Sequence, residues 1–175
     1  MHYGPPHLKR RSFLKLGIGS ALVLAVAGGA IALLQPGLID GKLSPSARLV
    51  MTRVAQAILD GSLPADAARQ KISLDALLGR MDNFIAGTPN AVQAELSQLL
   101  SLLASTAGRR ALVGLSISWE DASVADTSAA LQSMRVADMT LKQQAYLGLH
   151  DIVCAPYFSG EESWAVLGYP GPIPV

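Results

Sequence analysis

The stretch SPSARLVMTRVAQAILDG, residues Ser44–Gly61, decides the fold class of this chain. Ser44 is a favoured helix N-cap residue, and Pro45 suits the first helical position because its missing N–H would have no partner there. Gly61 is a typical stop signal after a helix. The apolar residues between these signals recur at helical spacing: Val50, Val54, Ala57 and Ile58. The stretch therefore predicts an amphipathic helix.

The same start and stop signals recur along the rest of the chain. They predict further helices over about Pro64–Ala86, from Thr88-Pro89 to Gly108, from Ser123 through Met134, and from near Thr140 to Pro156. The predicted apolar stripes are Ile72, Leu77, Leu78, Met81, Phe84 and Ile85 in the second helix, and Val92, Leu96, Leu99, Leu100 and Leu103 in the third. No alternating β-branched run is long enough for a strand. The sequence predicts an all-α fold, a compact bundle of about five helices.

Four regions follow from this pattern. Residues 1–34 are a basic and apolar leader, expected to be a signal peptide with an apolar helix. Residues 35–43 contain Pro36, Gly37 and Gly41 and are expected to form a linker. Residues 44–155 are expected to form the helical domain. Residues 156–175 are rich in Pro, Gly and aromatic side chains and are expected to form an irregular docking tail.

The leader places a basic segment before an apolar run from Leu16 to Leu34, which is the layout of an export signal. Its basic segment resembles the consensus R-R-x-F-L-K of the twin-arginine (Tat) pathway, with matches at Arg10, Arg11, Phe13, Leu14 and Lys15. That resemblance implies the Tat translocase as a partner and a periplasmic location. The apolar run is also nearly long enough to span a bilayer. An uncleaved leader that contacts the inner membrane is therefore the alternative.

Charge and composition exclude several function classes. Four of the fourteen basic residues precede the apolar run, and the remaining ten face thirteen acidic residues, so nucleic acid is not an expected partner. His150 is the one histidine beyond the leader, and Cys154 is the one cysteine, so no metal site is expected. We expect no cofactor in this chain and no enzyme activity. The rival hypothesis is an enzyme of unrecognised type that uses His150, Asp151 and Tyr157.

The C-terminal stretch APYFSGEESWAVLGYPGPIPV, residues 155–175, holds four of the nine aromatic residues and four of the ten prolines. Large aromatic side chains are common anchors at protein interfaces. Such a tail either wraps its own bundle or inserts into another protein. Cys154 directly precedes this stretch. An unpaired cysteine in an exported protein predicts either an intermolecular disulfide or a buried thiol.

The end of the chain resembles the C-terminal signature of the gluconate 2-dehydrogenase small-subunit family. The matching residues are Tyr157, Phe158, Trp164, Gly168, Tyr169, Pro170, Gly171 and Pro172. Residues 44–119 more closely resemble a subgroup of Tat-leader periplasmic proteins. Members of the family are small, helical and Tat-exported, and they accompany flavin-containing dehydrogenases of the glucose–methanol–choline (GMC) type. The resemblance implies a GMC-type large subunit that carries FAD, with a cytochrome subunit as a further partner through the complex.

Together these features predict a non-catalytic accessory subunit. It would escort a cofactor-loaded GMC-type dehydrogenase through the Tat pathway and stabilise it in the periplasm. Cys154 and the C-terminal signature residues would bind that partner. The alternative is a membrane-anchored helical adaptor, or a structural periplasmic protein with another partner. The chain has no C-x-x-C-H haem-attachment motif, so it is not expected to carry electrons itself.

Overall fold

Helices make up most of residues 35–171, the part of the chain that the computed structural model describes. The five long ones there are α3 (Pro45–Ile58), α4 (Ala67–Ala86), α5 (Asn90–Ala104), α7 (Val124–Arg135) and α8 (Thr140–Phe158). Short elements join or flank them: β1 (Leu38–Ile39), β2 (Lys42–Leu43), α6 (Thr106–Gly108), the π-helical η1 (Arg109–Val113), the 3-10 helix η2 (Glu161–Ser163) and α9 (Trp164–Leu167). The predicted all-α bundle is confirmed. The leader lies outside the described residues.

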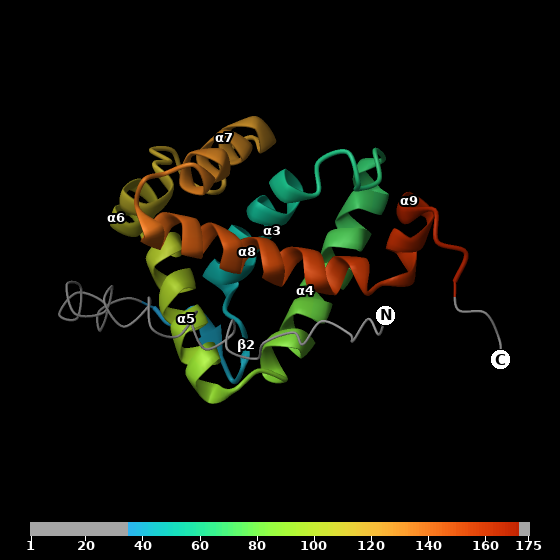
Figure 1. Cartoon of the computed structure of the whole chain (residues 1–175), viewed down its shortest axis with the longest axis horizontal. Coiled ribbons are helices and arrows are strands. Elements are labelled where there is room, and N and C mark those ends of the chain that lie inside the picture. Colours follow the sequence, from blue (N-terminus) through green and yellow to red (C-terminus); the bar gives the residue numbers. More distant parts are fainter. Residues whose placement is uncertain (1–34, 172–175) are drawn as a thin grey trace, which may run out of the picture.

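Helix α3 lies at the centre of the bundle. It packs against α4, α5, α7 and α8, and its Val50, Met51 and Val54 are fully buried. Helix α8 runs across the width of the bundle in front of α3, with α9 beyond its C-terminal end (Figure 1). Leu77 of α4 and Leu149 of α8 complete this shared core. The helix predicted from Ser44–Gly61 is thus the one that the others cover.

Two predicted N-caps are confirmed, and a third is wrong. The Ser44 hydroxyl accepts a hydrogen bond from the Ala47 N–H at 3.3 Å. Ser123 forms a capping box with Asp126, in which each side chain accepts a hydrogen bond from the other residue's N–H. Thr88 instead donates its hydroxyl back to the Ile85 carbonyl at 2.7 Å, at the end of the preceding helix. Helix α5 therefore begins after Pro89 without a side-chain cap.

The predicted apolar stripes are too wide. Ile72, Phe84 and Val92 are exposed, at 69%, 45% and 46% respectively. Helix α4 begins at Ala67, after the N-cap Asp66, and buries a narrower stripe: Leu74, Leu77, Leu78, Met81 and Ile85. These residues follow the i, i+3, i+4 spacing of one helix face. Ile72 and Phe84 lie outside that face, so their hydrophobicity did not indicate burial.

The predicted linker forms a β-hairpin. Strands β1 and β2 pair antiparallel, with Leu38 opposite Leu43 and Ile39 opposite Lys42. Asp40 and Gly41 make the turn with φ of 51° and 73°, the positive values that a type I′ turn requires. The hairpin packs against α5 and α4, and Leu43 is buried. Residues 35–43 are therefore part of the folded domain.

The predicted boundary at Pro156 is also wrong, because α8 continues to Phe158 with Pro156 inside it. Proline removes one helical N–H and crowds the preceding turn, and this usually ends a helix. Here the Pro156 carbonyl accepts hydrogen bonds from Arg80 Nε at 2.9 Å and from the Ser159 hydroxyl at 3.0 Å. Helices η2 and α9 follow, so residues 156–167 are mostly helical, where an irregular tail was expected.

The predicted third helix also ends earlier than Gly108. Helix α5 stops at Ala104, and Ser105 accepts a hydrogen bond from the Gly108 N–H to begin the short turn of α6. A side chain at Gly108 would place its Cβ 2.1 Å from the Leu102 carbonyl oxygen. Glycine is therefore required there because the two backbones meet. No helix within residues 35–171 is long and apolar enough to cross a bilayer.

Candidate functional site: the outer face of α8 and the C-terminal segment

The predicted site residues fall into three groups in the structure. The Tat-motif residues Arg10, Arg11, Phe13, Leu14 and Lys15, and Pro172 of the tail, lie outside the described residues. Cys154, Tyr157 and Phe158 lie on α8. Trp164, Gly168, Tyr169, Pro170 and Gly171 lie in the segment that follows, residues 159–171, which we call the C-terminal segment.

Helix α8 has a clear inner and outer face. Ala145, Leu149 and Val153 face the core and are buried. The opposite face carries Leu147 at one end and Phe158 at the other, with His150, Asp151 and Cys154 between them. Leu147, Cys154 and Phe158 follow one another at spacings of seven and four residues, and His150 and Asp151 each lie three or four residues from Leu147 and from Cys154, so all five share one side of the helix. Cys154 and Phe158, both predicted to bind a partner, therefore lie on the same outer face of α8.

Cys154 and His150 are neighbours on this face. The Cys154 Sγ lies 3.5 Å from His150 Nε2, and His150 Nδ1 lies 3.5 Å from Asp151 Oδ1. Burial of the thiol, together with the negative charge of Asp151, raises the pKa of Cys154 above its ordinary value. The thiolate is the reactive form of cysteine, and a raised pKa lowers its population at neutral pH. The Cys154 thiol is therefore a poor nucleophile at neutral pH.

Tyr157 belongs to the core of this chain, which corrects its predicted role at a partner surface. Its side chain is only 2% exposed, and its hydroxyl donates a hydrogen bond to the Ser62 carbonyl at 2.7 Å. The hydroxyl thus points toward the loop between α3 and α4. Because it is engaged there, the structure does not assemble His150, Asp151 and Tyr157 into one catalytic group.

Phe158 lies at the boundary between the core and the surface. Its ring meets the Tyr157 ring edge-to-face, with centroids 5.1 Å apart, and its side chain is 37% exposed. Tyr157 thus holds one side of Phe158 while the other side faces solvent. Phe158 remains a candidate for partner contact, whereas the buried Tyr157 packs against its ring from the core side.

The C-terminal segment folds around Trp164. The Trp164 and Tyr169 rings meet edge-to-face with centroids 5.3 Å apart, and the Tyr169 N–H donates to the Trp164 carbonyl at 2.9 Å. Gly171 is buried against the same indole, where an added Cβ would lie 3.2 Å from a ring carbon. Gly168 and Gly171 have φ of 66° and 98°, which favour glycine. Trp164 therefore organises its own segment.

Large apolar side chains remain exposed around this segment. Leu167 is 57% exposed and Tyr169 is 48% exposed, and Pro170 is exposed as well. Half of the twelve exposed large hydrophobic residues in the described part of the chain lie between residues 136 and 169: Val136, Met139, Leu147, Phe158, Leu167 and Tyr169. We call these six residues the α8 apolar surface.

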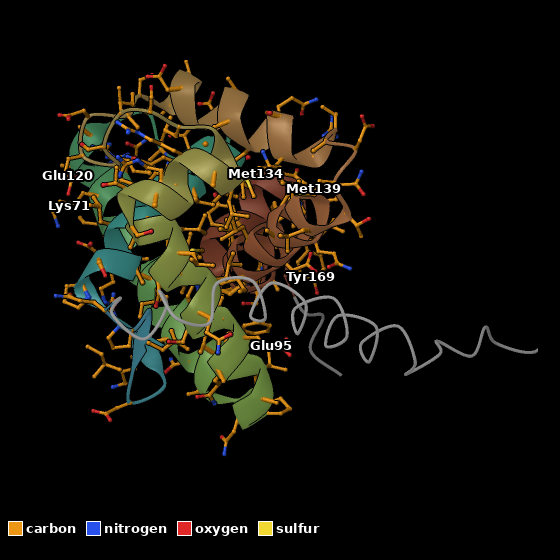
Figure 2. All side chains as sticks on the ribbon, turned by 90° about the vertical axis from the view of Figure 1, so that its left-hand side faces the viewer. Lys71, Glu95, Glu120, Met134, Met139 and Tyr169 are labelled. Atoms are coloured by element: carbon orange, nitrogen blue, oxygen red, sulfur yellow. The ribbon has the colours of Figure 1, made fainter. Side chains whose placement is uncertain are left out.

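The six residues of the α8 apolar surface lie on α8 or in the segments that flank it. Met139 precedes α8 and Tyr169 follows it, and both lie on the side away from Lys71 and Glu120 (Figure 2). Exposed apolar residues that gather over one element are typical of a contact surface, whereas single ones are normal. The arrangement suits contact with another protein better than catalysis.

The described residues offer no group of three His, Cys, Asp or Glu side chains that could hold a metal ion. No protein-family model, no curated protein and no solved structure matches this chain. The candidate site therefore rests on the geometry of the described residues and on the sequence signature.

Proposed function

We propose that this chain is a non-catalytic small subunit that escorts a cofactor-loaded GMC-type flavin dehydrogenase through the Tat pathway and stabilises it in the periplasm. The twin-arginine motif at Arg10 and Arg11 supports the export route. The Tat machinery moves folded proteins. A flavoprotein that must fold around FAD before export would therefore benefit from a partner that carries this signal.

One observation carries the proposal: the signature residues of the C-terminal segment leave apolar surface exposed. Tyr169 and Leu167 are about half exposed although the segment that contains them packs its own tryptophan against the Tyr169 ring. Exposed aromatic side chains are typical anchors of protein interfaces. Phe158, at the end of α8, extends the same surface.

The described residues support a division of labour within the signature. Tyr157 and Gly171 are buried and Trp164 is partly buried, so these residues shape the segment. Phe158, Leu167 and Tyr169 are exposed, so these would contact the large subunit. Cys154 is a free, partly buried thiol on the same face, and an intermolecular disulfide would require it to become more exposed.

The test is co-expression of this chain with a GMC-type dehydrogenase encoded beside it. Purification from the periplasm through a tag on this chain should give a stoichiometric complex with the absorption spectrum of an oxidised flavin. Replacing Arg10-Arg11 by Lys-Lys should remove the complex from the periplasm while a yellow complex forms in the cytoplasm. A colourless tagged chain, exported alone just as well, would contradict the proposal.

A further inference from the structure

A small pocket lies beside the loop between α3 and α4, and none of the six residues of the α8 apolar surface lines it. It has a volume of about 230 Å³ and opens between the end of α3, the loop after it, and the first turns of α4 and α7. The residues that matter for its chemistry are Gln56, Asp60, Leu63, Pro64, Gln70 and Val124. Nothing in the proposed escort role uses this pocket.

The volume limits what the pocket can hold. Sites for cofactors and drug-sized ligands usually measure about 300–1,000 Å³. At about 230 Å³ the pocket is too small for a flavin or a dinucleotide. It can hold one group about the size of a single amino-acid side chain.

The lining provides one charge and several apolar contacts. Asp60 is the one charged residue of the lining, and its carboxylate makes no hydrogen bond or ion pair with the described residues. The side-chain amide of Gln70 likewise has no hydrogen-bond partner among them. Leu63, Pro64 and Val124 provide apolar walls. A ligand that matches this lining has a positively charged head and a short apolar stem.

A nearby cation does not occupy this position. Arg53 donates to the side-chain oxygen of Gln56 at 3.2 Å, but it also donates to the Trp119 carbonyl at 2.9 Å and to the Glu120 carbonyl at 2.7 Å. These bonds hold the Arg53 guanidinium on Gln56 and on the backbone of residues 119–120. Arg53 does not line the pocket. The charge preference of the pocket therefore rests on the Asp60 carboxylate.

We propose that the pocket binds an alkylammonium group, supplied either by a free small amine or by a lysine side chain of another protein. An ammonium head is compact and donates up to three hydrogen bonds, which Asp60 and the Gln70 side-chain oxygen can accept. The methylene stem packs on Leu63, Pro64 and Val124. This inference does not depend on the escort role.

The test uses the ¹⁵N-labelled full chain, titrated with n-butylammonium chloride at constant ionic strength and, in parallel, with butan-1-ol. We expect saturable shifts of the Gly61 and Gln70 amide signals, with butan-1-ol binding about tenfold more weakly because it lacks the charge. Equal binding of the two probes, or no saturable shift with n-butylammonium, would overturn the proposal.

Variants locate the site. Asp60→Asn should weaken n-butylammonium binding about tenfold, to the level of the alcohol. Asp138→Asn makes the same change in net charge beyond the far end of α7, and it should leave binding unchanged. Gln70→Leu tests the site independently, because Gln70 lies on α4 while Asp60 lies in the loop after α3. It should weaken n-butylammonium binding about threefold. Retention of full affinity in both Asp60→Asn and Gln70→Leu would contradict the site.

The source of the ammonium group is tested with Nα-acetyl-lysine N-methylamide, which presents a lysine side chain as a protein does. Affinity equal to that of n-butylammonium would assign the pocket to a lysine of another protein. Affinity at least about tenfold weaker would assign it to a free amine, since the peptide groups then clash with the rim.

Discussion

The two ends of the described chain are fastened to the bundle in different ways. At the N-terminal end, hydrogen bonds connect the hairpin to distant helices: the Leu38 N–H donates to Ser97 Oγ at 3.1 Å and the Leu43 N–H to Asp82 Oδ1 at 2.9 Å. At the C-terminal end, the hydrogen bonds described in residues 160–171 join near neighbours, such as Ser163 with Gly160 and Tyr169 with Trp164.

The N-terminal hairpin is part of the core, whereas the C-terminal segment leaves apolar side chains exposed to solvent. The hairpin places Leu43 in the core, and Gly37 is buried against α5 so closely that a Cβ would lie 2.4 Å from the Ser97 carbonyl oxygen. The C-terminal segment packs its own tryptophan and leaves Leu167 and Tyr169 exposed. Residues 37–43 are thus held tightly while apolar side chains of residues 160–171 stay exposed, which would suit the proposed docking through the C-terminal segment.

The largest effect is expected at Asp82, which fastens the hairpin. Asp82 is 7% exposed, and its second oxygen forms an ion pair with Arg48 of α3. Asp82→Ala would leave the Leu43 N–H and the Arg48 guanidinium without this partner, and it should lower the free energy of unfolding by about 3 kcal/mol. Chemical denaturation measures this loss.

Asp75→Ala is the matched control on the same helix. Asp75 pairs with Lys71 at 2.6 Å, but both side chains are well exposed, so the loss should stay below about 0.5 kcal/mol. Similar losses in the two variants would mean that the N-terminal end is not specifically fastened by Asp82.

The second effect is expected in the C-terminal segment, where a substitution should weaken partner binding more than it lowers the free energy of unfolding. If the proposed complex with a GMC-type large subunit forms, Tyr169→Ala should weaken it about thirtyfold, or about 2 kcal/mol, as truncated aromatic anchors do. The free energy of unfolding should change by no more than about 1 kcal/mol, because the side chain is 48% exposed and its ring contact is with Trp164 of the same segment. Titration calorimetry and denaturation give the two values. Full affinity in this variant would remove Tyr169 from the interface.

A third, smaller effect should show that Tyr157 belongs to the fastened part. Tyr157→Phe removes the hydroxyl that donates to the Ser62 carbonyl and should destabilise the fold by about 1 kcal/mol. Tyr169→Phe removes a hydroxyl from an exposed ring and should change stability by less than about 0.3 kcal/mol. If the two variants were equally stable, the distinction between a buried and an exposed signature tyrosine would fail.

The smallest effect concerns Cys154, at the boundary between the two parts. Because burial and the charge of Asp151 raise the pKa of the thiol above its ordinary value of 9.0, alkylation by iodoacetamide should be slow at pH 7 and rise toward alkaline pH. Asp151→Asn removes the negative charge, lowers this pKa and should speed alkylation at pH 8. A rate that falls or stays constant in this variant would argue against the electrostatic cause.

Much of the fold could be predicted from local signals. Ser44, Pro45 and Ser123 mark helix starts because capping depends on residues three positions apart. The exposed Ile72, Phe84 and Val92 were predicted as core because hydrophobicity reports preference for burial and not the width of the face that a neighbour covers. Pro156 was predicted to end α8, but Arg80, from a helix distant in sequence, binds its carbonyl.

The hairpin at residues 38–43 has a local sequence signal for its turn but none for its contacts with the helices. Asp40-Gly41 is a strong short-range indicator of a type I′ turn, but two-residue strands give no alternation to support it. Its fastening depends on Asp82, 39 residues away from Leu43, which no local pattern reveals. Trp119 was missed in the same way: its indole N–H donates to the Leu103 carbonyl at 2.7 Å, and the ring is 2% exposed.

The candidate site was predictable in composition but not in the roles of its residues. The aromatic and proline content pointed to the C-terminal stretch, and the free Cys154 pointed to the end of α8. Sequence alone did not separate Tyr157, which packs inward, from Phe158, which faces outward. Adjacent helical residues point about 100° apart, so which one faces the core depends on how the helix is rotated against its neighbours.

Hydrogen–deuterium exchange of this chain, alone and after co-expression with the proposed flavin dehydrogenase partner, tests the contrast between the two ends most directly. We predict that amides of residues 160–171 exchange quickly in the free chain and become protected in the complex. Amides of residues 38–48 should exchange slowly in both states, because the hairpin and the start of α3 are already fastened. Unchanged exchange in residues 160–171 on complex formation would contradict docking through the C-terminal segment.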